Sequence, residues 1–176
     1  MAKAADAPTT PLSHTVFQFF FASHIPATIL LDSQALFPSK MYPAAVVQTA
    51  KWYCETFGDP LMSNMPVWFK ALVGLEVAFE LPFFFAALYA LRTRKNWIRI
   101  PAIIYASHTV TALVPILASL ISDAPADKRA VLLSFYTPYI LIPAWIGVHF
   151  VCNPVPFPPL EDEASREAQD AKTKSQ

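Results

Sequence analysis

Residues 67–91 read VWFKALVGLEVAFELPFFFAALYAL, an apolar run whose charged side chains are Lys70, Glu76 and Glu80. About 20 apolar residues in an α-helix cross the roughly 30 Å hydrocarbon core of a bilayer. The run does not alternate polar and apolar residues, as the strands of a membrane β-barrel do. Residues 67–91 therefore predict a transmembrane helix.

Three further runs of similar character occupy residues 15–36, 98–122 and 130–152. Lipid offers backbone N–H and C=O groups no partners, so helices are the expected spanning form. We expect an all-α, four-helix transmembrane bundle over residues 14–152. An N-terminal tail, residues 1–13, and a disordered C-terminal tail, residues 153–176, are expected to flank it.

Composition excludes several classes of function. Only 15% of the 176 residues are charged and 55% are hydrophobic, against about 25% charged in soluble domains. Thirteen basic residues balance thirteen acidic ones, so no basic surplus points to nucleic acid. Three glycines leave no glycine-rich phosphate loop, and nothing indicates a cofactor.

Basic residues in the short links predict the orientation of the chain. The link RTRKNWIR, residues 92–99, carries four basic residues, whereas Lys128 and Arg129 in the last link are offset by Asp123 and Asp127. Since basic links stay in the cytosol, residues 92–99 and both termini are expected to be cytosolic. The two cysteines then lie on opposite sides of the membrane, and no disulfide is expected between them.

The chain ends in KTKSQ, with Lys172 and Lys174 at the fifth and third positions from the end. This matches the KxKxx retrieval signal of endoplasmic reticulum membrane proteins, an address that a receptor reads on a cytosolic tail. The alternative is a charged tail without a signal.

The stretch between the first two spans predicts a short amphipathic helix. Pro43 can begin a helix through AAVVQTAKWYCETF, and Trp52 suits a membrane interface. We expect this helix to lie at the lumenal surface, where it either caps the bundle or rests on the membrane without such a role.

Ionisable side chains occur within the predicted spans, where they cost roughly 2.5–3.5 kcal/mol each and point to function. At 1.5 Å per residue they fall at similar depths on three helices, and Glu76 and Glu80, four apart, share a helix face. We expect an internal polar cluster of His24, Asp32, Glu76, Glu80 and His108. The alternative is a buried network that only fixes helix positions. His and Glu are suitable metal ligands, but nothing in the spacing is diagnostic, and no metal site is expected.

Aromatic side chains and prolines surround this cluster. Tyr136 and Tyr139 on the last span can offer ring faces to a cation beside a carboxylate, although most aromatics here are expected to fill the bundle. Prolines kink helices, and such kinks either open an internal polar pocket or merely fit the helices together. Every span holds at least one: Pro26, Pro82, Pro115, Pro138 and Pro143.

Five ordered stretches carry a resemblance to a known family: ASHIPATILLDSQALFP, KWYCETFGDPLM, WFKALVGLEVAFELPFF, WIRIPAIIYASHTVTALVPIL and YTPYILIP. They resemble the sigma-2 receptor family of small four-helix endoplasmic reticulum proteins. That family lies within the EXPERA group, which also includes emopamil-binding protein, a sterol isomerase. The resemblance spans about residues 14–152.

The resemblance implies that acids on the first two spans, here Asp32 and Glu76, line an occluded pocket that opens towards the membrane. Such a pocket binds amine drugs and sterols. The matching aromatics are Tyr136 and Tyr139, and the positions of His24 and Trp52 are close by. Asp59, in the motif DPL, looks structural but near the pocket. A homodimer is also implied.

One departure from the family pattern is Glu80, where sigma-2 receptors carry Gln. The extra acid favours proton-transfer chemistry, but the chain lacks the five-helix architecture of the isomerase. We therefore expect a non-enzymatic protein that binds a sterol or a cationic amphiphile and regulates sterol homeostasis or transport. The alternatives are an isomerase-like enzyme using Glu76 and Glu80, and a proteostasis factor for mitochondrial precursor proteins.

Overall fold

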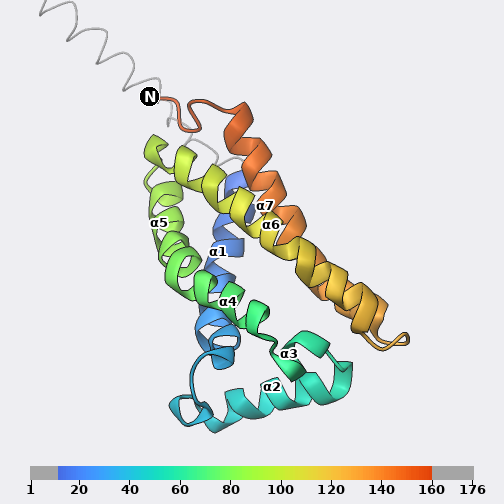
Figure 1. The fold of residues 1–176 in the computed structure, drawn as a ribbon. Coiled ribbons are helices and arrows are strands. Elements are labelled where there is room, and N and C mark those ends of the chain that lie inside the picture. The colour runs from blue at the N-terminus through green and yellow to red at the C-terminus, as the bar shows by residue number, and fades with distance from the viewer. Residues whose placement is uncertain (1–11, 160–176) are drawn as a thin grey trace, which may run out of the picture.

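A computed structural model describes residues 12–159 (Figure 1). Four stretches in it are long and apolar enough to cross a membrane, and no strand occurs in the described residues. The all-α, four-span prediction is confirmed, and the largest shift is at the first span, which begins at residue 12 rather than 15. The spans are Leu12–Ala35, Val67–Arg92, Asn96–Asp123 and Arg129–Cys152.

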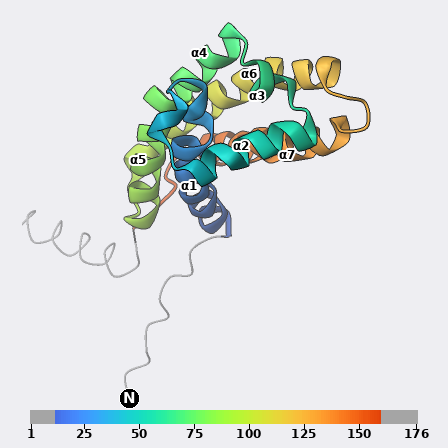
Figure 2. The same cartoon turned by 90° about the horizontal axis from the view of Figure 1, so that it is seen from below.

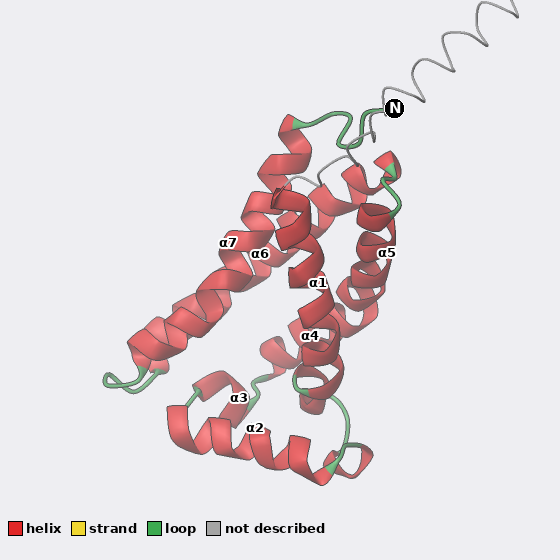
Figure 3. Cartoon of the chain, turned by 180° about the vertical axis from the view of Figure 1, so that it is seen from behind, coloured by secondary structure: helices red, strands yellow, loops and turns green. Residues whose placement is uncertain are grey.

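The described chain is helical almost throughout (Figure 3). In order it forms α1 (Leu12–Leu30), η1 (Asp32–Ala35), η2 (Ser39–Met41), α2 (Ala44–Phe57), α3 (Pro60–Asn64), α4 (Val67–Leu75), η3 (Glu76–Glu80), α5 (Leu81–Arg92), η4 (Asn96–Ile98), α6 (Arg99–Asp123) and α7 (Arg129–Cys152).

The second span is not one continuous α-helix. Its middle, η3, is a π-helical turn, closed by a hydrogen bond from the Leu81 backbone N–H to the Glu76 carbonyl. Pro82 follows at once and has no N–H to continue the α-helical ladder, which explains a widened turn at this point. Figure 1 shows the span bending where α4 passes into α5.

The four spans associate as two pairs. α1 lies mainly against α5, and α6 lies against α7 along most of its length. Figures 1 and 3 show the α6–α7 pair diverging from α1 and α4 towards the end of the bundle where α2 lies. The close approach within the second pair is made possible by Gly147, whose Cβ position would lie 3.0 Å from the Ala106 Cβ.

The buried apolar side chains form two separate clusters. One, which we call the aromatic half, contains Phe17, Phe21, Phe84, Tyr105 and Phe150, all almost fully buried. The other lies towards α2, α3 and α4 and is mainly aliphatic; we call this end of the bundle the cavity half.

The C-terminal segment extends the folded domain beyond residue 152, where the sequence-based boundary lay. Phe157 is 4% exposed and belongs to the aromatic half. The Asn96 side chain donates to the Phe157 carbonyl at 2.9 Å and accepts from its N–H at 2.9 Å, which fastens the segment to the link before α6. The retrieval motif at Lys172 and Lys174 lies outside the described residues.

α2 covers the stretch predicted to form a short amphipathic helix and lies across the end of the bundle (Figures 1 and 2). Pro43 precedes it, and Gly58 ends it in the left-handed conformation, with φ of 63°. Cys54 on α2 and Cys152 at the end of α7 lie at opposite ends of the bundle, and both are free thiols.

Candidate ligand-binding cavity

The divergence of the helix pairs leaves a cavity of about 340 Å³ in the cavity half. Residues from α1, α4, η3, α6 and α7 line it, and α2 closes one side. Its walls are mostly apolar. Eight of the nine side chains predicted to bind ligand border it: His24, Asp32, Trp52, Glu76, Glu80, His108, Tyr136 and Tyr139.

Asp32 and Glu76 border the same cavity from neighbouring helices. Asp32 opens η1, directly after α1, and Glu76 is the first residue of the π-helical turn. The fully buried Thr28 hydroxyl donates to Glu76 Oε1 at 2.6 Å, which ties the second span to the first. Each of two adjacent spans thus contributes at least one lining carboxyl, and Glu76 is held in place by α1.

Glu80 ends the π-helical turn and is 6% exposed. Its Oε1 lies 2.7 Å from His108 Nδ1 and accepts a hydrogen bond from Thr109 Oγ1 at 2.9 Å. Glu76 and Glu80 were expected to act as a pair on one helix face. Both border the cavity, but each is hydrogen-bonded to a different neighbouring span. The partner of Glu76 lies on α1, and the partners of Glu80 lie on α6.

Aromatic rings line the same cavity as these acids. The His24 ring lies 4.7 Å from the Tyr139 ring and 5.2 Å from the Phe84 ring, measured between centroids. His24 therefore sits where the cavity meets the aromatic half. Ring faces beside carboxyl groups attract a desolvated cation through the ring quadrupole.

Asp59 was predicted as a site residue that looks structural and lies near the pocket, and it does not line the cavity. It is fully buried, and its Oδ1 caps α3 by accepting from the backbone N–H groups of Leu61 and Met62. Its Oδ2 accepts from the hydroxyls of Tyr53 at 2.9 Å and Tyr136 at 2.8 Å. Asp59 therefore fastens α2 and α3 to α7 and acts through the two tyrosines that border the cavity.

Tyr53 lies on α2, outside the spans. Burial, followed by the nearby Asp59 carboxylate, raises the pKa of the Tyr53 hydroxyl well above its usual range. The hydroxyl therefore stays protonated at neutral pH and remains a donor to Asp59.

Three polar partners in this region were not singled out from the sequence: Thr28, Thr109 and Tyr53. The hydroxyl of a threonine in a span can donate a hydrogen bond to a backbone carbonyl of its own helix, as Thr109 also does to the Tyr105 carbonyl at 3.0 Å. A threonine in the sequence therefore does not by itself indicate a partner on another helix. Among residues 12–159, no group of three or more His, Cys, Asp or Glu side chains could hold a metal ion.

Comparison with known proteins gives concordant matches. The family described as EXPERA (EXPanded EBP superfamily) matches residues 45–150. Sigma intracellular receptor 2 of Homo sapiens is 41% identical over 149 residues, which cover 77% of this chain and 85% of the receptor. Sigma intracellular receptor 2 of Xenopus tropicalis is 40% identical over 150 residues, which cover 79% of this chain and 88% of that receptor. Efficient mitochondria targeting-associated protein 19 of Schizosaccharomyces pombe is 28% identical over 146 residues, which cover 80% of this chain and 76% of that protein.

Proposed function

Because this chain belongs to the EXPERA family, with sigma intracellular receptors 2 among its relatives, we propose that it is an intramembrane binding protein for a sterol or a cationic amphiphile. The observation that carries the proposal is that Asp32 and Glu76, from adjacent spans, border one largely apolar cavity.

The cavity combines the features that such a ligand requires. Apolar walls bury a hydrocarbon skeleton, and a few polar groups fix its orientation. Carboxyl groups within a membrane are costly and therefore point to a function, and here they border the same cavity as the Tyr139 and His24 rings. A protonated amine is held by the carboxyl groups and ring faces together, and a sterol hydroxyl can use the same carboxyl groups.

The test is amine binding by purified variants. We expect Asp32→Asn and Glu76→Gln each to weaken the binding of a cationic amphiphile at least tenfold while the protein stays folded. Each removes a charge and keeps the shape of the side chain. Asp127→Asn, an exposed acid in the last link, is the matched control and should bind normally. Unchanged affinity in both cavity variants would refute the site.

The natural ligand can be sought by mass spectrometry of lipids that co-purify with the protein. We expect a sterol or a cationic lipid to be enriched in the wild type and depleted in Asp32→Asn. Equal recovery from both proteins would show that the lipid binds elsewhere.

We place the protein in the endoplasmic reticulum membrane, with both termini in the cytosol and a role in sterol homeostasis or transport. The basic link after α5 and the lysines Lys172 and Lys174 support this placement. Replacing both lysines with serine is expected to move a tagged protein out of the endoplasmic reticulum. We also propose that the protein is a homodimer and that it works with a sterol-transport partner protein.

A sterol double-bond isomerase is the second candidate. Such an enzyme needs an acid that protonates the alkene and a base that removes a proton elsewhere on the ring system. Glu80, paired with His108 beside the same cavity as Glu76, favours this candidate. We expect no isomer when purified protein is given sterol intermediates. Turnover that disappears in Glu76→Gln or Glu80→Gln would instead establish the enzyme.

The relative from Schizosaccharomyces pombe favours a third candidate, because its name refers to efficient mitochondria targeting. In this case the protein would assist mitochondrial precursor proteins at the endoplasmic reticulum. Delayed import of such precursors in cells lacking the protein, restored by Asp32→Asn as well as by wild type, would separate this role from ligand binding.

A further inference from the structure

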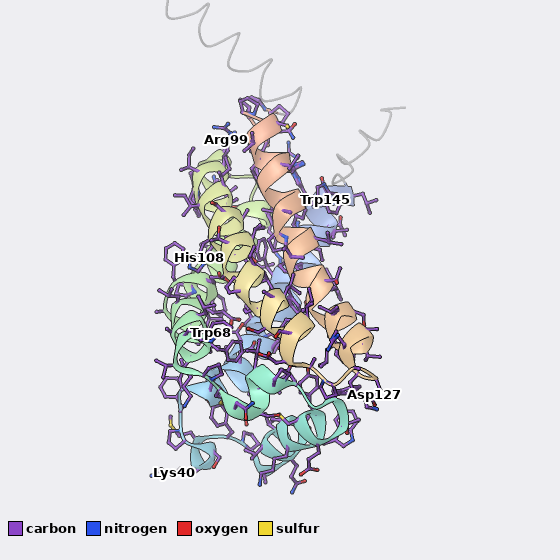
Figure 4. The ribbon with its side chains drawn as sticks, turned by 45° about the vertical axis from the view of Figure 1, so that its right-hand side comes forward. Lys40, Trp68, Arg99, His108, Asp127 and Trp145 are labelled. Atoms are coloured by element: carbon purple, nitrogen blue, oxygen red, sulfur yellow. The ribbon has the colours of Figure 1, made fainter. Side chains whose placement is uncertain are left out.

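His108 and Glu80 form a second polar site in the cavity, apart from Asp32 and Glu76. The Glu80 carboxyl is almost fully enclosed and is held by His108 Nδ1 and Thr109 Oγ1. His108 itself is more open, with 30% of its side chain accessible, and its ring borders the cavity. In Figure 4 it lies part-way along the bundle, between Arg99 at one end and Lys40 at the other.

The polar atom that remains on this ring is Nε2. Nδ1 is committed to Glu80, and among the described residues no hydrogen bond reaches Nε2. Nor is Nε2 among the fully enclosed side-chain atoms that lack a partner. Whichever group of the pair carries the proton, Nε2 can make one further hydrogen bond, as an acceptor in one neutral tautomer and as a donor otherwise.

The two polar sites are separated along the second span. Glu76 and Glu80 stand at the two ends of the π-helical turn, so the backbone positions of these two acids lie on the order of 5 Å apart along the helix axis. Each is also anchored to a different neighbour, Glu76 to Thr28 on α1 and Glu80 to His108 on α6. These attachments hold the separation fixed.

We propose that His108 Nε2 is a second anchor for ligand and that the cavity selects amphiphiles with two polar groups. One is the cationic nitrogen or hydroxyl held by Asp32 and Glu76. The other is a hydrogen-bonding oxygen about one helical turn away, bound by His108. Glu80 and Thr109 act as positioning residues that fix the imidazole ring. This inference rests on the proposed function and names the class of ligand more narrowly.

The experiment compares two probes with purified protein in nanodiscs: N,N-dimethyldodecylamine and the same amine with a hydroxyl on the fourth carbon from nitrogen. We expect the wild type to bind the hydroxylated probe about 3–10-fold more tightly, the range that one added hydrogen bond provides. His108→Leu should abolish this preference, so that the two probes bind with equal affinity. His108→Gln, which keeps a polar group opposite Glu80 but lacks the far ring nitrogen, should do the same.

The matched control is His149→Gln, which removes a histidine of the aromatic half that pairs with His14 at 3.2 Å. It should keep the preference. The inference is overturned if the wild type shows no preference, if both His108 variants retain it, or if they weaken both probes equally. If the plain amine binds but is insensitive to Asp32→Asn and Glu76→Gln, the proposed function itself fails, which is a different result.

Discussion

The half of the bundle around Phe17, Phe84 and Tyr105 is filled by side chains, whereas the half beside α2 encloses a cavity, although the same four spans build both. None of the buried residues of the aromatic half lines the cavity. By contrast, Phe69, Val73 and other members of the second cluster serve as cavity wall. The closely packed core and the cavity proposed to bind ligand therefore lie at different depths of one bundle.

The distribution of charge follows the same division. Within residues 12–159, the buried or half-buried acids Asp32, Asp59, Glu76 and Glu80 all lie in the cavity half, while the aromatic half contains none. Polar groups are expensive in a membrane and weaken a close-fitting core. A rigid aromatic half lets the other half keep acids and an open interior without unfolding.

The largest expected effect tests this division directly. Phe84→Ala should lower the free energy of unfolding by about 3–5 kcal/mol, because Phe84 is fully buried among aromatic rings. The Phe135 side chain borders the cavity and is 40% exposed, so Phe135→Ala should lower the free energy of unfolding by less than half as much. Thermal unfolding in detergent measures both. Equal losses would show that the two halves do not differ in this way.

The second prediction concerns the contact that closes the cavity half. Asp59→Asn should destabilise the protein by about 1.5–3 kcal/mol, because Tyr53 and Tyr136 lose a charged acceptor. α2 and α3 should loosen while the aromatic half stays intact. Glu55→Gln, which alters an exposed acid on α2, is the control and should have no effect.

Cys54 reports on this loosening. Burial raises the pKa of its thiol, so at pH 7.5 it carries less thiolate than an exposed cysteine and should react slowly with maleimide. In a Cys152→Ser background, Asp59→Asn should speed the labelling of Cys54, because exposure to water lowers the pKa again. Unchanged labelling would place the role of Asp59 elsewhere than in closing the cavity.

Much of this arrangement could be predicted from the sequence. The four spans and α2 follow from apolar runs and from Pro43, which are local signals. The cavity-lining acids could be found because a charge inside an apolar run is conspicuous: Asp32, Glu76 and Glu80 all border the cavity.

What escaped prediction depends on how the helices are rotated against one another. The pattern around Glu76 does not show a π-helical turn, and it does not say that Thr28 and His108 each bind one of the two acids. The motif DPL indicated a structural role for Asp59, but not that its carboxylate would accept hydrogen bonds from Tyr53 on α2 and Tyr136 on α7. Phe157 follows a proline-rich stretch, so its burial against the bundle has no periodic signal.

The smallest expected effect compares two glycines, one in each half. Gly147→Ala on α7 would place a methyl group 3.0 Å from the Ala106 side chain, whereas at Gly74 on α4 nothing lies within 4 Å of the new methyl. Replacing glycine by alanine in a helix gains up to about 1 kcal/mol when there is room. Overfilling a close helix contact costs about 1–3 kcal/mol.

We therefore expect Gly147→Ala to lower the unfolding temperature and Gly74→Ala to leave it unchanged or raise it. Because the two substitutions are chemically identical, their difference isolates the local space around each glycine. Gly147→Ala should also leave amine binding unaltered, since the contact lies outside the cavity walls. If Gly147→Ala is as harmless as Gly74→Ala, then α6 and α7 can separate at this contact, and the aromatic half is less rigid than the division between the halves requires.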